Sequence, residues 1–146
     1  MEKLKVFLDT NVIVSYFQGR RDVVDLFSKK VLEKVQYIVN PIVYQEIILV
    51  MERMQKNDPS RIDLEKLDDF VEVVQIDRSK MDFYINKMRE FRNLLVHTND
   101  ILILQTAILE CDYLLTLDNN LLQISQIDSL KIVSPREYFI MLGVRQ

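Results

Sequence analysis

Short apolar runs alternate along this chain with stretches of helical periodicity. Five runs are predicted to be strands, because they are rich in Val, Ile, Leu and aromatic residues and are bounded by polar residues. They are Leu4 to Leu8, Gln36 to Val39, Phe70 to Ile76, Tyr113 to Leu117 and Leu130 to Val133. In the first run, three consecutive apolar residues, Val6 to Leu8, are typical of a central parallel strand buried on both faces.

Between these runs, apolar residues recur at helical spacing, and several helix starts carry capping residues. Asn40-Pro41, for example, provides an N-cap and a proline at the first helical position. The predicted helices are Val12 to Phe17, residues 21 to 34, Pro41 to about Gln55, a short helix after Ser60, Ser79 to Leu95, a helix from Asn99-Asp100 and a closing helix after Ser134. This alternation predicts an α/β fold, a three-layer sandwich with a central, mostly parallel five-stranded sheet. Without a linker, residues 1–146 are expected to form a single domain.

Composition excludes several classes of site. With only two glycines, the chain has no GxGxxG or Walker-type loop. The single cysteine, Cys111, excludes an internal disulfide and a cysteine zinc site within one chain. The lone histidine, His97, excludes two-histidine ribonuclease chemistry and is interpreted as a loop or helix-end residue. No apolar run exceeds five residues, so we expect no membrane span, no signal peptide and a cytoplasmic location.

The net charge of −3 argues at first against a nucleic-acid partner. If four of the 22 acids surround metal ions, however, 18 acids face 19 bases, and the surface can carry basic patches. The candidate patches are Arg20-Arg21, Lys29-Lys30 and the run Lys87, Arg89 and Arg92. Such runs are more often solvated helix faces, so alone they do not indicate a nucleic-acid partner.

Four carboxylates stand out by their positions. Asp9 and Asp118 follow the first and fourth predicted strands, Asp100 opens an apolar helix, and Glu46 lies on an apolar helix face. Taken singly, each has a structural explanation: a helix cap for Asp9 and Asp100, a turn for Asp118, and a helix-edge acid for Glu46. Taken together, all four can border the crevice at the carboxyl ends of parallel strands.

Carboxylates that share one crevice repel each other, and a divalent cation relieves that repulsion. An oxygen-rich site without histidine or cysteine suits Mg²⁺ or Mn²⁺ better than zinc. The sequence therefore predicts a magnesium or manganese site.

Four segments in order resemble the successive motifs of PIN-domain nucleases. They are Leu8-Asp9-Thr10-Asn11, Gln45-Glu46-Ile47, Asn99-Asp100 with Thr106-Ala107, and Leu115-Thr116-Leu117-Asp118. The resemblance spans nearly the whole chain, whose length is most similar to VapC-type toxin ribonucleases. The resemblance implies a metal-dependent endoribonuclease whose products carry a 5′-phosphate and a 3′-hydroxyl. It also implies that the protein forms a homodimer and that a cognate antitoxin binds it.

Carried over by residue, the resemblance makes Asp9, Glu46, Asp100 and Asp118 the acidic tetrad that binds the metal. It makes Thr116 the hydroxyl residue that steadies the last acid and the metal shell. Two departures from the family pattern are Asn120, where a further acid is common, and the bulky Ile101 to Ile103, where small residues are common. The first bears on a second metal site and the second on packing.

Other interpretations remain open at this point. A PIN-like fold that binds RNA or a partner protein without cutting is the alternative from another class. A Mg²⁺-dependent phosphatase or receiver-type domain fits less well, because the paired acids and the late-strand lysine of receivers are absent. The apolar residues Ile47, Ile48, Val50 and Met51 either form a dimer surface or pack within the monomer.

Overall fold

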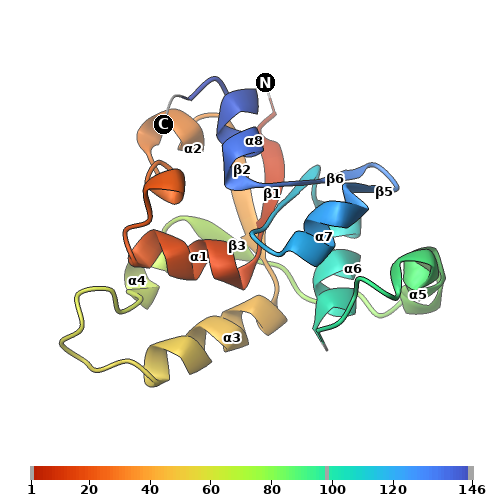
Figure 1. The fold of residues 1–146 in the computed structure, drawn as a ribbon, viewed down its shortest axis with the longest axis horizontal. Helices are drawn as coiled ribbons and strands as arrows, with labels where there is room; N and C mark the ends of the chain where they lie inside the picture. Colours follow the sequence, from red (N-terminus) through yellow and green to blue (C-terminus); the bar gives the residue numbers. More distant parts are fainter. Residues whose placement is uncertain (1, 98, 145–146) are drawn as a thin grey trace.

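A six-stranded, mostly parallel sheet forms the centre of the fold in the computed structural model, which describes residues 2–97 and 99–144 (Figure 1). The strands are β1 (Leu4–Leu8), β2 (Val35–Val39), β3 (Val71–Val73), β4 (Tyr113–Leu115), β5 (Gln126–Ile127) and β6 (Leu130–Val133). Their order across the sheet is β3-β2-β1-β4-β6-β5, and only the β5–β6 pair is antiparallel. The predicted α/β class and parallel sheet are confirmed.

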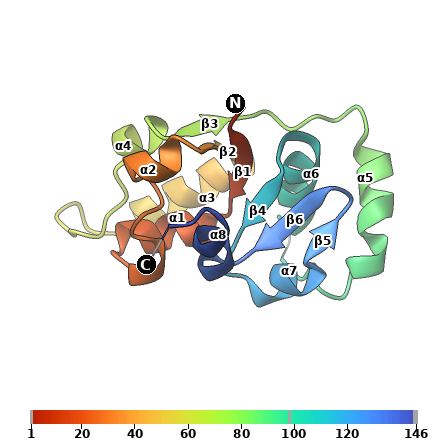
Figure 2. The ribbon, with the colours of Figure 1, turned by 90° about the horizontal axis from the view of Figure 1, so that it is seen from above.

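Helices cover both faces of this sheet (Figure 2). They are α1 (Thr10–Phe17), α2 (Lys29–Leu32), α3 (Pro41–Glu52), α4 (Leu64–Asp68), α5 (Met81–Met88), α6 (Asp100–Glu110), α7 (Asn119–Ile124) and α8 (Pro135–Met141), with 3-10 turns η1 (Arg21–Val23) and η2 (Arg89–Phe91). Among the described helices, none combines the length and apolar character needed to cross a membrane.

The core lies on both sides of the central strands. Val6, Phe7 and Leu8 of β1 have no exposed surface, as predicted for a strand covered on both faces. Burial of such side chains contributes about 1.5–3 kcal/mol each. β1 lies between β2 and β4, near the middle of the sheet. Its carboxyl end, which Asp9 follows, therefore lies near the middle of one edge of the sheet.

The prediction of five strands was wrong by one. The additional strand, β5, is two residues long and pairs with β6 through a hairpin at Asp128-Ser129. Asp128 adopts a positive φ of 54°, which aspartate tolerates better than most residues. Two residues carry no periodicity, so no apolar pattern marks this strand.

Five other predicted elements are shorter than expected. Two of them are the fourth strand, which ends at Leu115 rather than Leu117, and the helix predicted over 79–95, which ends at Met88 and is followed by η2. The predicted helix over residues 21–34 is divided into η1 and α2, because Ser28 caps a new helix by accepting a hydrogen bond from the N–H of Val31. Helix α3 ends at Glu52 rather than near Gln55. The third strand is an exposed edge strand of three residues, Val71–Val73, rather than 70–76.

A hydroxyl pair in the core joins β2 to α8 and gives a testable prediction. The hydroxyls of Tyr37 and Tyr138 lie 2.8 Å apart, and both side chains are buried. Replacing either tyrosine by phenylalanine is expected to lower the free energy of unfolding by about 1–3 kcal/mol, because the remaining hydroxyl loses its buried partner. The double variant should lose less than either single variant, since no unpaired hydroxyl is left.

Urea denaturation at constant pH measures these three differences. Tyr44→Phe is the matched control, because the Tyr44 hydroxyl bonds to Asp68 at the surface and its loss is expected to cost about 0.5 kcal/mol or less. Additive losses in the double variant would contradict the assigned hydroxyl pair.

Candidate functional site

Asp9 lies at the point where β1 ends and α1 begins. It is the N-cap of α1, and its Oδ1 accepts a hydrogen bond of 2.8 Å from the N–H of Thr10. Its Oδ2 accepts one of 2.7 Å from the Thr116 hydroxyl and a longer one of 3.4 Å from the Asn11 side chain. The structural role considered for Asp9, a helix cap, is therefore present, but the cap uses only one of its two carboxylate oxygens.

Burial raises the pKa of Asp9 to about 6, against an ordinary value of 3.8. The hydrogen bonds from Thr116 and Thr10 oppose this rise in pKa, whereas the negative charges of Glu46 and Asp100 add to it. The carboxylates of three separate elements therefore act on each other.

Asp100 is the first residue of α6 and is 4% exposed. Its Oδ2 accepts a hydrogen bond of 3.1 Å from the backbone N–H of His97. Burial raises the pKa of Asp100, the His97 hydrogen bond opposes the rise, and the charges of Asp118 and Glu46 reinforce it. This acid is thus held at the helix start and faces two other acids.

Glu46 reaches the same place from α3. Val43 and Ile47 on this helix are buried, so the helix packs its apolar stripe inward as its sequence predicts. The Glu46 Oε1 accepts a hydrogen bond of 3.1 Å from the Thr10 hydroxyl. Thr10 therefore links the acid of α3 to the start of α1.

Asp118 follows β4 and is the N-cap of α7. Its Oδ1 accepts a hydrogen bond of 2.8 Å from the N–H of Asn120, and its Oδ2 lies 3.6 Å from the Nε2 of His97. Asn120, which stands where the resemblance implied a further acid, is thus bonded to Asp118 through its backbone N–H.

Thr116 is fully buried between the two strand-end acids. The sequence-based expectation was that it steadies the last acid, but its hydroxyl donates to the first acid, Asp9. It contacts Asp118 only by accepting a hydrogen bond of 3.0 Å from that residue's N–H. The Thr116 hydroxyl therefore links the carboxylate of Asp9 to the backbone of Asp118.

All four predicted acids line one cleft of about 680 Å³ at the carboxyl ends of β1 and β4. The cleft also contains Thr10, Asn11, Arg20 and His97, to which sequence reasoning gave no defined role in the site. His97 had a weak signal, its position three residues before Asp100. The only sequence signal for Arg20 was its place in the basic pair Arg20-Arg21.

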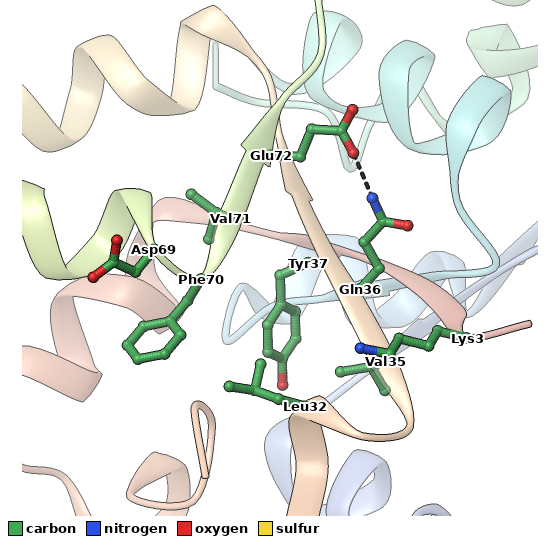
Figure 3. Close-up of a pocket in the computed structure, with 9 residues that line it drawn as sticks. All are labelled: Lys3, Leu32, Val35, Gln36, Tyr37, Asp69, Phe70, Val71 and Glu72. Atoms are coloured by element: carbon green, nitrogen blue, oxygen red, sulfur yellow. Dashed lines mark hydrogen bonds between the residues drawn. The ribbon is translucent and has the colours of Figure 1, made fainter. Parts of the chain in front are cut away.

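A second hollow of about 460 Å³ lies at the amino-terminal ends of β2 and β3, whereas the first cleft lies at the carboxyl ends of the strands (Figure 3). Its walls combine the rings of Tyr37 and Phe70 with a hydrogen-bonded pair, Gln36 and Glu72. The carboxylates of Asp69 and Glu72 point away from each other in this view. Unlike the first cleft, it does not gather several acids.

The donor chemistry of the first cleft fits a hard divalent cation. Its acids are Asp9, Glu46, Asp100 and Asp118, and the raised pKa of Asp9 reflects both burial and repulsion that a cation would relieve. The acids do not form a preassembled ligand set: within residues 2–97 and 99–144, no three His, Cys, Asp or Glu side chains are close enough to hold a metal ion.

Comparisons with known proteins agree with this architecture. The sequence model of one family, described as PIN domain, matches residues 6–127. A chain of the VapBC2 crystal structure from Rickettsia felis, bound to a DNA fragment from its promoter, has a TM-score of 0.69 at 21% identity, over 90% of this chain and 98% of that one. Chains from DNA-bound VapBC of Salmonella typhimurium and VapBC-1 of nontypeable Haemophilus influenzae both have TM-scores of 0.63 at 19% identity, over 90% and 91% of this chain and 98% and 99% of theirs. No curated protein sequence gives a significant match.

Proposed function

This chain belongs to the PIN-domain family, and from that membership we propose that it is a metal-dependent endoribonuclease that hydrolyses RNA phosphodiester bonds. The observation that carries the proposal is the meeting of four acids from four separate segments in one cleft. Helix capping explains single acids of this set, but it does not explain their convergence or the pKa of about 6 at Asp9.

Asp9, Asp100, Asp118 and Glu46 are proposed to hold Mg²⁺ or Mn²⁺. When bound, such a cation lowers the pKa of a water molecule and offsets negative charge on the scissile phosphate and the leaving oxygen. The chain supplies the orientation of these acids: the Thr116 hydroxyl fixes Asp9, the Thr10 hydroxyl fixes Glu46, and the N–H of His97 fixes Asp100. Each acid keeps oxygen lone pairs available after these contacts.

The biological setting is proposed to be a toxin–antitoxin pair. The structural neighbours are described as VapBC complexes and a toxin-antitoxin complex, and they share the fold over nearly their whole length. We therefore propose an antitoxin protein as partner. A homodimer, which the resemblance to VapC-type toxins implies, is proposed as the assembled state. The apolar residues considered for a dimer surface do not all reach the surface, because Ile47 is fully buried and Val50 and Met51 pack against the core.

Incubation of the protein with a mixed pool of RNA oligonucleotides and Mg²⁺ or Mn²⁺ tests the proposed activity. We expect shortened products that carry a 5′-phosphate and a 3′-hydroxyl, no products with excess EDTA, and recovery when the cation is restored. Sequencing of the product ends identifies the cut bonds. Retention of RNA without product under all cation conditions would contradict the nuclease and indicate the binding module instead.

A further inference from the structure

The acid-lined cleft contains one arginine. Among the described residues that line it, Arg20 is the only lysine or arginine, and Asp9, Glu46, Asp100 and Asp118 are the acids. These carboxylates repel a polyanion, since like charges a few ångströms apart interact strongly where water is partly excluded. A positively charged side chain fixed in the cleft therefore attracts the phosphates of any nucleic acid that enters.

Local backbone structure explains why Arg20 faces the cleft. Helix α1 ends in a Schellman motif: Gly19 has a φ of +75° and its N–H bonds to the carbonyl of Tyr16, while the N–H of Arg20 bonds to the carbonyl of Ser15. A positive φ at this position favours glycine. The motif turns the chain back at the end of α1 and fixes the backbone of Arg20.

The guanidinium of Arg20 retains donors for a ligand. Its Nη2 makes an ion pair of 2.8 Å with Oδ2 of Asp22, and the two side chains are 49% and 37% exposed. A guanidinium has five N–H donors, and an exposed ion pair is weak, so this contact orients the arginine without consuming it. Arginine also matches the planar, two-point geometry of phosphate oxygens.

We propose that Arg20 binds a backbone phosphate of the RNA strand, at a nucleotide other than the one that is cut. This inference rests on the proposed function, because it assumes that RNA enters the cleft. Helix α1 has eight residues and is therefore about 12 Å long. Asp9 precedes this helix and Arg20 follows it, so the two side chains come from its opposite ends. One strand that runs along α1 reaches both.

Equilibrium binding of a 12-nucleotide single-stranded RNA, measured in EDTA at several salt concentrations, tests this contact. For single strands, each lost phosphate contact flattens the slope of log K against log salt by about 0.7. Arg20→Gln should show this change and an affinity loss of about tenfold at low salt. Arg20→Lys should keep the slope, because it keeps the charge.

Arg21→Gln is the matched control, since it removes the same charge from the adjacent, exposed residue that does not line the cleft. Equal slopes and affinities for Arg20→Gln and Arg21→Gln would overturn the inference. In cleavage assays, Arg20→Gln should raise KM more than it lowers kcat. If Arg20→Gln flattens the salt slope relative to the wild type but the wild-type protein does not cut RNA, only the proposed activity is overturned.

Discussion

Replacing Asp100 by asparagine is expected to lower the rate of RNA cleavage by at least about a hundredfold, because a bound divalent cation contributes several kcal/mol to this chemistry and would lose a charged ligand. Asp100 is buried at the start of α6, and its pKa is raised by burial and by the charges of Asp118 and Glu46. Asparagine has nearly the same shape and can still accept the hydrogen bond from the N–H of His97. The variant therefore removes the charge and leaves the fold.

Two measurements separate a lost ligand from lost structure. Initial rates at saturating Mn²⁺ should fall for Asp100→Asn, while its melting temperature in EDTA stays equal to or above that of the wild type, since a buried charge is removed. The control variant is Asp82→Asn, which makes the same change at an exposed acid outside the cleft. Cleavage by Asp100→Asn within threefold of the control would remove Asp100 from the proposed site.

The parts of the fold that the sequence predicts are those with strong local signals. The apolar run at residues 6–8 identified the central strand, and Asn40-Pro41 and Ser134-Pro135 marked the starts of α3 and α8. Strand ends followed by acids then placed Asp9 and Asp118 at the carboxyl edge of the sheet. Their meeting in one cleft follows from the adjacency of β1 and β4.

The features that the sequence did not reveal depend on tertiary contacts. The partner of the Thr116 hydroxyl is set by the register of β1 against β4, and 107 positions separate it from Asp9. Arg20 lines the cleft because a glycine ends α1 in a specific motif, and one glycine in a sequence does not specify that motif. The short strand β5 exists only as the partner of β6.

Without a divalent cation, the stability of this protein is expected to fall as pH rises from about 4 to 7. The pKa of Asp9 is about 6 in the folded protein, against an ordinary value of 3.8. Between these values the folded state holds more protons than the unfolded state, so raising the pH favours unfolding. At one unit of pKa per about 1.36 kcal/mol, Asp9 alone accounts for at most about 3 kcal/mol. Asp100, whose pKa is also raised, acts in the same direction.

Added Mn²⁺ is expected to reverse this loss of stability, and to do so more at pH 7.5 than at pH 5. A cation at 100 times its Kd adds about 2.7 kcal/mol, which raises the melting temperature of a chain of this size by about 5–10 °C. At pH 5 the cation competes with the proton on Asp9, so the shift in melting temperature should be much smaller.

Differential scanning fluorimetry with Mn²⁺, Mg²⁺ and EDTA measures both the pH dependence and the shift caused by the cation. Asp9→Asn should remove the Mn²⁺ shift and the part of the pH dependence that Asp9 supplies, so that only the part from Asp100 remains. Asp82→Asn should keep both effects. A Mn²⁺ shift of equal size at pH 5 and pH 7.5 would show that the cation does not compete with the proton on Asp9.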